Sequence, residues 1–342
     1  MEHLFDYLLF LAQAVTVVLA ILVVAGMVAT MNQRRQEHEP GHLEVRKLNQ
    51  RLTDLRHAVE EIVLPEGELK HRRKQEMREE KQTAKAERRE TADEGSGKPR
   101  LFVLDFDGDL EATRTEQLRT EISAILSLAR PTDAVLLRLT SPGGMVPHYG
   151  LAASQLHRIR KQDIPLVVAV DKVAASGGYL MAAVASRIIA APFALVGSIG
   201  VVAEVPNVHR LLEKNNVDWD VYTAGQHKRT LTVFGRNTEE GRQKFIEELE
   251  DTHALFKEFV SENRPDLDMD AIATGEAWYG RRAIDLRLVD ELCTSDEYVT
   301  RACEDRDVFE VRWVEHRRPI DRLMSELRGM TDRLGRLLAW VR

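Results

Sequence analysis

Short apolar runs alternate with longer amphipathic segments from Leu101 onward. Runs rich in Val, Leu and Ile predict buried strands, and apolar positions that recur every three or four residues predict helices. In chain order, the predicted strand, helix, strand, helix and strand span 101–105, 114–129, 134–140, 149–161 and 165–170. This βαβαβ order predicts an α/β domain with a parallel sheet and right-handed crossovers.

The side chains become small after the third of these strands. The sequence A-A-S-G-G-Y (174–179) runs into an apolar stretch, 179–185, that is predicted to be helical. A serine on such a strand-to-helix turn has its hydroxyl at a helix N-terminus, where free backbone N–H groups favour developing negative charge. The adjacent glycines would let a substrate backbone approach closely. This stretch alone fits Ser176 equally well as a nucleophile or as an ordinary N-cap.

A second glycine turn follows the strand 134–140, in the sequence L-T-S-P-G-G-M (139–145). Gly143 and Gly144 would therefore lie at the carboxyl edge of the sheet, where open parallel sheets place their ligand sites. A plain Pro-Gly turn is the alternative. Two glycine turns at the same sheet edge favour an oxyanion pocket.

The remainder of the domain has weaker patterns. Residues 220–232 predict a strand that runs into an irregular loop, and 238–263 predict a long helix. A shorter helical segment is expected at 268–274, and 277–290 predict a turn and a helix that return to a strand edge.

An uncharged segment near the N-terminus, 7–31, is long enough to span a bilayer as a helix. Glu2 and Asp6 stand where a signal peptide would be basic, and no small-residue cleavage site follows, so we expect an uncleaved single span. Lys and Arg residues follow this segment but do not precede it. The positive-inside rule therefore favours a cytoplasmic location for the rest of the chain.

The sequence between this span and the α/β domain is polar. Apolar residues from Val45 to Ile62 recur at spacings of three and four, which fits a self-associating heptad helix or an ordinary amphipathic helix. Residues 66–98 are rich in charge and predict a solvated helix or a linker. The predicted divisions are a transmembrane anchor (1–34), a heptad-like helix with a charged linker (35–100), the α/β domain (101–315) and a basic amphipathic C-terminal helix (316–342) that would pack on its own domain, on another subunit or on a membrane.

Composition narrows the range of partners. The chain has 342 residues and a net charge of −7, and this mild acidity gives no indication of nucleic-acid binding. Cys293 and Cys303 match no metal-binding spacing and are compatible with one disulfide or none. We expect no cofactor and no metal.

A serine nucleophile needs a base to remove its proton. No histidine in the chain stands out as that base by its sequence setting. Lys228 lies in the polar sequence A-G-Q-H-K-R-T-L-T, beside His227 and Arg229. A buried lysine can act as a base because desolvation lowers its pKa. Most lysines are solvated surface residues, so the residues alone leave Lys228 as one candidate.

Four motifs in one chain resemble the signal peptide peptidase A family of membrane serine peptidases. They are S-P-G-G (141–144), A-S-G-G-Y (175–179), G-S-I-G (197–200) and the lysine loop (225–230). The similarity covers 101–315 closely and the N-terminal region in its layout, where the single span and the charged spacer most resemble the SohB branch. It implies a ClpP/crotonase-like α/β fold with a repeated ββα core around a parallel sheet.

The resemblance also implies a Ser/Lys dyad that hydrolyses peptides such as signal peptides or membrane-protein fragments. Ser176 would be the nucleophile and Lys228 the general base, and Ser198 of the G-S-I-G motif would hydrogen-bond the lysine amine. No residue at the motif positions departs from the family pattern.

The remaining implications concern the oxyanion hole, the assembly and the membrane. Gly143, Gly144 and the N–H group of Gly177 would bind the oxyanion. Family members with one catalytic domain form rings, so we expect a homo-oligomeric ring in which Ser176 and Lys228 come from adjacent subunits. The best-known relatives work on the outer side of the bacterial inner membrane, whereas the charge asymmetry of this chain favours the cytoplasmic side.

Two other functions are compatible with the sequence. A crotonase-like acyl-CoA hydratase or isomerase would share the sheet and its glycine turns, but such enzymes commonly place carboxylates where the proton moves. A non-catalytic membrane scaffold would keep the fold without the chemistry. The presence of Ser176, Lys228 and Ser198 argues against the scaffold.

Overall fold

The computed structural model describes residues 15–16, 41–90, 98–225 and 227–315, and both sheets belong to the compact unit Leu43–Trp313. Nearly all of the predicted span 7–31 and the predicted C-terminal helix from 316 onward lie outside the described residues. Within the described residues, no helix combines the length and the hydrophobicity that a membrane crossing requires.

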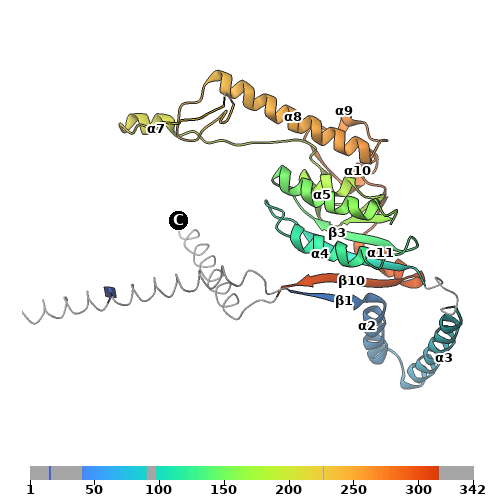
Figure 1. The fold of residues 1–342 in the computed structure, drawn as a ribbon. Coiled ribbons are helices and arrows are strands. Elements are labelled where there is room, and N and C mark those ends of the chain that lie inside the picture. Colours follow the sequence, from blue (N-terminus) through green and yellow to red (C-terminus); the bar gives the residue numbers. More distant parts are fainter. Residues whose placement is uncertain (1–14, 17–40, 91–97, 226, 316–342) are drawn as a thin grey trace, which may run out of the picture. The chain divides into compact units, whose positions relative to one another are not determined.

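The larger sheet has seven strands in the order β1-β10-β2-β3-β4-β6-β9 (Figure 1). Its strands are β1 (His42–Lys47), β2 (Arg100–Asp107), β3 (Ala134–Thr140), β4 (Leu166–Val170), β6 (Arg187–Ala190), β9 (Glu291–Leu292) and β10 (Asp307–Val314). The pairs β10/β2, β2/β3, β3/β4, β4/β6 and β6/β9 are all parallel. The prediction of an α/β domain with a parallel sheet is therefore confirmed, and the three predicted strands are β2, β3 and β4.

Both faces of this sheet are buried, because side chains of its central strands alternate between two apolar clusters. On β2, Phe102 and Leu104 belong to one cluster, whereas Leu101 and Val103 belong to the other. The first cluster includes residues of α4 (Thr115–Leu126), α5 (Val146–Arg160) and α6 (Gly177–Ala183); the second includes residues of α2 (Leu48–Val63) and α11 (Ser295–Asp305). Helices thus cover the sheet on both sides.

A second sheet of three strands carries the predicted nucleophile. It has the order β5-β7-β8, with strands β5 (Val173–Ala175), β7 (Leu195–Gly197) and β8 (Ala277–Tyr279). We expected Ser176 to follow directly after the predicted strand that forms β4, and this expectation was wrong. Asp171 accepts hydrogen bonds from the Ser295 N–H and hydroxyl groups, at 2.8 and 2.5 Å, where the chain leaves β4. The chain then enters β5, which precedes Ser176.

Several other expectations are corrected or refined. Val45 was expected in a helix but lies in strand β1, and the helix after it begins at Leu48. Of the two alternatives for the charged segment 66–98, a solvated helix forms over α3 (Glu66–Glu90). The long helix is α8 (Glu239–Asn263). The other helices are α7 (His209–Lys214), α9 (Met269–Ile272) and α10 (Gly280–Ala283).

No strand forms among the described residues of 220–232, where one was expected. Side-chain amides satisfy the backbone there instead: Asn237 accepts from the Thr232 N–H at 2.8 Å, and Asn207 donates to the Thr232 carbonyl oxygen at 2.9 Å. Such side-chain hydrogen bonds offer the backbone an alternative to a strand ladder.

A buried carboxylate joins the start of β2 to the loop before β3. Asp133 has a fully buried side chain and accepts hydrogen bonds from the backbone N–H and the guanidinium of Arg100 and from the N–H of Arg130. Burial works to raise the pKa of Asp133, but these hydrogen bonds outweigh it and lower the pKa to about 2. The ionised form therefore stabilises the fold.

We expect Asp133→Asn to lower the free energy of unfolding by about 2 kcal/mol at pH 7. Because the folded-state pKa lies below the ordinary value, the contribution is present at neutral pH and is lost as the pH falls toward 2. Urea unfolding at pH 7 and pH 3 measures it. Glu247→Gln, in the exposed pair with Lys244, is the control and should change stability by less than about 0.5 kcal/mol. An equal deficit for Asp133→Asn at both pH values would contradict this account.

Candidate active site

Ser176 occupies a strained turn between β5 and α6. Its φ is +52°, which is uncommon for a residue with a side chain and typically costs about 1–3 kcal/mol. Two backbone hydrogen bonds hold it: the Ser176 N–H donates to the Gly197 carbonyl oxygen at 2.8 Å, and the Leu180 N–H donates to the Ser176 carbonyl oxygen at 3.0 Å. The Ser176 hydroxyl makes no capping hydrogen bond. Helix capping therefore does not explain this serine.

Ser198 leaves the neighbouring strand at the same end. β5 and β7 are parallel and pair Ala175 with Gly197, so Ser176 and Ser198 are the next residues of two adjacent strands. Ser198 also has a positive φ, +51°, and its N–H donates to the Glu276 carbonyl oxygen at 2.6 Å. Both serines are half-buried. Neither hydroxyl has a hydrogen-bond partner among the described residues, so both are available to a group from outside.

The S-P-G-G turn packs directly against Ser176. Ser141 pairs with β5: its N–H donates to the Val173 carbonyl oxygen at 2.8 Å, and its carbonyl oxygen accepts from the Ala175 N–H at 3.0 Å. A Cβ atom on Gly143, where φ is +92°, would lie 2.7 Å from the Ser176 Cβ. Only glycine fits at this position.

The backbone N–H groups of the predicted oxyanion hole differ in their partners. The Gly143 N–H donates to the Ser141 hydroxyl oxygen at 3.1 Å. The N–H groups of Gly144 and Gly177 donate to no described residue. The structure thus brings Ser176, Ser198 and the three glycines together, and leaves the last two N–H groups available to a developing oxyanion.

Lys228 is not brought to this site within one chain. Its side chain is exposed, and its amine makes no hydrogen bond or ion pair with a described residue. Its backbone N–H donates to the Gly225 carbonyl oxygen at 3.2 Å. His227 and Arg229 beside it are exposed as well.

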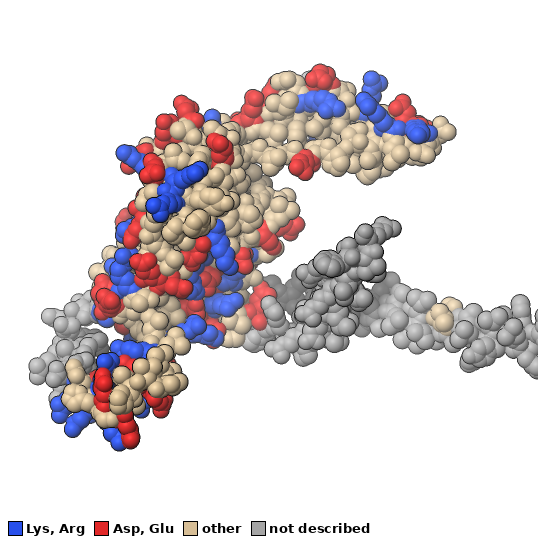
Figure 2. Space-filling model, turned by 180° about the vertical axis from the view of Figure 1, so that it is seen from behind, with Lys and Arg blue, Asp and Glu red and all other residues tan. Residues whose placement is uncertain are grey.

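The segment that carries Lys228, 201–238, exposes many large apolar side chains. Tyr222 is 90% exposed and Val202 84%, and Trp219 and Phe234, whose ring centroids are 4.8 Å apart, are each more than 40% exposed. The other members of this group are Val205, Leu211, Val217 and Val221. Figure 2 shows few charges on the lower side of this segment and of α8. An exposed apolar patch of this kind is typical of a surface that binds another protein.

An apolar pocket of about 360 Å³ opens beside Ser176. Val146 and Tyr149 of α5 and Leu180 of α6 form one part of its lining. α8 supplies the other part, with Thr252, Leu255, Phe256 and Phe259. The sequence did not predict that α8 lines this pocket. The apolar positions of a long helix do not indicate which distant strand end the helix will cover.

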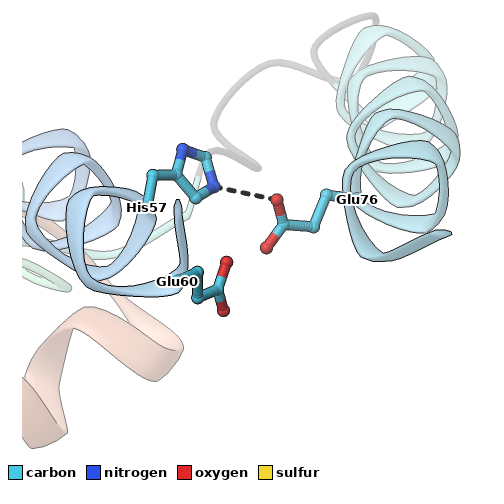
Figure 3. A group of neighbouring side chains, drawn as sticks. All are labelled: His57, Glu60 and Glu76. Atoms are coloured by element: carbon cyan, nitrogen blue, oxygen red, sulfur yellow. Dashed lines mark hydrogen bonds and ion pairs between the residues drawn. The ribbon is translucent and has the colours of Figure 1, made fainter. Parts of the chain in front are cut away.

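One group of side chains has the composition of a metal site. His57 Nε2 lies 2.8 Å from Glu76 Oε2, and Glu60 is nearby between α2 and α3 (Figure 3). However, Arg56 Nη2 lies 2.5 Å from Glu76 Oε1, and Arg72 Nη1 lies 3.3 Å from Glu60 Oε1. Guanidinium groups already neutralise both carboxylates, so we interpret this group as an ion-pair network that joins the two helices.

We expect Gly143→Ala to reduce peptide hydrolysis at least about 100-fold and to lower stability by about 1–3 kcal/mol. The added Cβ atom would displace the Ser176 side chain or the turn. Casein hydrolysis and thermal unfolding of the whole chain measure the two effects. Gly67→Ala in α3 is the matched control, because a Cβ atom there meets nothing within 4 Å. Wild-type hydrolysis by Gly143→Ala would show that the turn does not pack against the Ser176 side chain.

Comparisons with known proteins match this chain along most of its length. The family model "Peptidase family S49 N-terminal" matches residues 2–156, and "Peptidase family S49" matches residues 158–309. "Probable protease SohB" of Haemophilus influenzae is 51% identical over 317 residues, which cover 91% of this chain and 89% of that protein. "Putative signal peptide peptidase SppA" of Enterococcus faecium is 26% identical over 242 residues, which cover 67% of this chain and 70% of that protein.

Among solved structures, a serine-to-alanine mutant of the 1510-N membrane-bound stomatin-specific protease has a TM-score of 0.40 and 12% identity, covering 60% of this chain and 86% of that chain. The resemblance found in the motifs is confirmed by the sequence matches. Because both family models match in order and a SohB protease shares 51% of the aligned residues along nearly the whole chain, this chain belongs to peptidase family S49 and is a serine peptidase.

Proposed function

We propose that this chain is a membrane-anchored endopeptidase in which Ser176 is the nucleophile, Lys228 the general base and Ser198 the residue that orients the lysine amine. The strained Ser176 turn carries this proposal, because it lines one pocket with Gly144 and Gly177, whose N–H groups have no partner among the described residues. A serine in an ordinary turn would need neither the strain nor the unpaired donors.

The proposed reaction passes through an acyl-enzyme. The neutral Lys228 amine takes the Ser176 hydroxyl proton while the oxygen attacks the scissile carbonyl carbon. The Gly144 and Gly177 N–H groups stabilise the oxyanion that forms. The intermediate then expels the amine of the leaving peptide, which receives the proton from Lys228. A water molecule attacks the acyl group by the same proton transfers and releases the second product.

A second copy of the chain would complete this site. A lysine acts as a base near neutral pH only when burial lowers its pKa, yet Lys228 is exposed in the single chain. The apolar side chains of segment 201–238 provide a surface that another subunit would bury. We therefore place Ser176 and Lys228 of one active site on adjacent subunits of a homo-oligomeric ring.

The pocket indicates the class of substrate. Its lining is mostly apolar and lies against Ser176, so an apolar side chain next to the scissile bond would fill it. Signal peptides and fragments of membrane proteins are rich in such residues. This substrate class also fits an enzyme held at the bacterial inner membrane by the segment 7–31.

We expect Ser176→Ala and Lys228→Ala each to reduce casein or signal-peptide cleavage by the detergent-solubilised chain below about 0.1% of wild type. Ser176→Ala removes the nucleophile, and Lys228→Ala removes the group that activates it. Lys74→Ala, at an exposed position of α3, is the matched control and should keep wild-type turnover. Wild-type turnover in either dyad variant would refute the assigned dyad.

Mixing the two inactive variants tests whether the dyad joins two subunits. After dissociation and reassembly, a mixed ring contains some sites with an intact serine from one variant and an intact lysine from the other. Activity should therefore return to a fraction of wild type. A mixture that stays as inactive as its components, in rings shown to contain both variants, would contradict shared sites.

The side of the membrane is tested by reporter fusions. The absence of Lys and Arg before the span predicts that the catalytic domain is cytoplasmic. Alkaline phosphatase fused after residue 100 should then be inactive, and green fluorescent protein fused there should fluoresce. Active alkaline phosphatase at this position would place the domain on the outer side.

A further inference from the structure

A chain of buried hydrogen bonds lies behind the glycine turn. The Ser141 hydroxyl oxygen is 2.5 Å from the Tyr149 hydroxyl oxygen, and the Tyr149 hydroxyl donates to the Asp109 carbonyl oxygen at 2.7 Å. The Ser141 oxygen also accepts from the Gly143 N–H at 3.1 Å. Ser141 and Tyr149 have no exposed surface.

The direction of donation is the same in every hydrogen bond of this series, from the Gly143 N–H toward the Asp109 carbonyl oxygen. Since the Tyr149 hydroxyl gives its single proton to the Asp109 carbonyl, it must accept from Ser141. The Ser141 hydroxyl therefore donates to Tyr149 and accepts from the Gly143 N–H. Each hydroxyl donates once and accepts once. Removal of the Tyr149 hydroxyl leaves the buried Ser141 hydroxyl without an acceptor, and removal of the Ser141 hydroxyl leaves the Gly143 N–H without its acceptor.

The space around these hydroxyls is filled. A Cβ atom on Gly108 would lie 2.6 Å from both the Ser141 and the Tyr149 oxygen, and a Cβ atom on Gly177 would lie 2.4 Å from the Tyr149 ring. Tyr149 thus touches the first residue after the nucleophile with its ring and holds the turn with its hydroxyl. No room is left for a water molecule to replace a lost hydroxyl.

The loop that ends this chain of hydrogen bonds also contacts the other glycine of the turn. The Leu110 carbonyl oxygen accepts from the Met145 N–H at 2.8 Å, and it would lie 2.2 Å from a Cβ atom on Gly144. The Ser141 hydroxyl fixes the position of the turn at Gly143, and the Leu110 carbonyl oxygen restricts it at Gly144.

We infer that Tyr149 and Ser141 are positioning residues for the peptidase reaction, which fix the glycine turn against Ser176 through the chain Gly143 N–H, Ser141 hydroxyl, Tyr149 hydroxyl and Asp109 carbonyl. By engaging the Gly143 N–H, they leave the Gly144 N–H as the turn's donor to the oxyanion and set its distance from the nucleophile. Neither residue touches the reacting atoms. This inference rests on the proposed role of Ser176.

The chemistry of the phenol suits this role. Burial raises the pKa of Tyr149. The raised pKa favours the neutral phenol, and with it the direction in which the hydroxyl donates.

The test compares Tyr149→Phe with Tyr179→Phe in the whole detergent-solubilised chain. Both tyrosines are fully buried, and the Tyr179 hydroxyl also donates to a carbonyl oxygen, that of Leu288 at 3.1 Å. Tyr149→Phe should lower kcat for peptide cleavage about 10- to 100-fold and leave KM within about threefold, because the turn is displaced but the pocket is intact. Tyr179→Phe should keep kcat within about twofold.

Labelling of Ser176 by a fluorophosphonate separates positioning from folding. Tyr149→Phe should label more slowly than wild type but reach the same final stoichiometry, whereas a partly unfolded protein would reach a lower one. Ser141→Ala removes the other hydroxyl of this series of hydrogen bonds and should cause the same loss of kcat. The double variant Ser141→Ala/Tyr149→Phe should lose no more kcat than the worse single variant, because both act through one chain of hydrogen bonds.

Three results would overturn the inference. They are an unchanged kcat in Tyr149→Phe, an equal loss in Tyr179→Phe, and losses in the two hydroxyl variants that multiply in the double variant. If Tyr149→Phe does not fold, Ser141→Ala decides, and its wild-type kcat would overturn the inference. Full activity in Ser176→Ala would instead refute the proposed function, so the two failures are distinguishable.

Discussion

The candidate site depends on holding Ser176 in a backbone conformation that residues with side chains rarely adopt. The Ser176 N–H donates to the Gly197 carbonyl oxygen on the neighbouring strand, and the Ser176 carbonyl oxygen accepts from the Leu180 N–H in the first turn of α6. These two hydrogen bonds fix the backbone on both sides of the residue. The glycines around Ser176 are needed because a Cβ atom at their positions would not fit. At Gly143 and Gly177 such an atom would overlap Ser176 or Tyr149. The strain is therefore sustained by the close packing of these glycines and by the two backbone hydrogen bonds, as expected where a surrounding structure over-determines an unfavourable conformation.

The sequence predicted the three central strands β2, β3 and β4 of the large sheet because they are buried on both faces. Such strands are continuous apolar runs, and β2, β3 and β4 all carry this signal. The three-residue strands of the second sheet carry almost none. β5 consists of Val173, Ala174 and Ala175, which are indistinguishable from a small-residue turn, so Ser176 was attached to the wrong strand.

The site itself was predicted unevenly. Glycines and serines in short motifs have conformational reasons to stand where they do, and the sequence indicated Ser176, Gly143 and Gly144 from that chemistry. The partners that hold them are set by tertiary contacts. Nothing local indicates that Tyr149 would reach Ser141, or that α8 would line the pocket with Phe256 and Phe259. Lys228 is a third case, because it is exposed in the single chain and its polar sequence setting left it as one candidate base.

The position of β10 between β1 and β2 has a consequence for biosynthesis. β10 is the last described strand to leave the ribosome, yet Val308 pairs with Leu101 in the interior of the large sheet. Until it emerges, β2 has an unpaired edge, and an unpaired edge is a template for aggregation. The large sheet therefore stays incomplete until β10 has left the ribosome. The two parts matched by separate family models share this sheet, and a chain that stops short of Asp307 would expose the apolar edge that this strand covers.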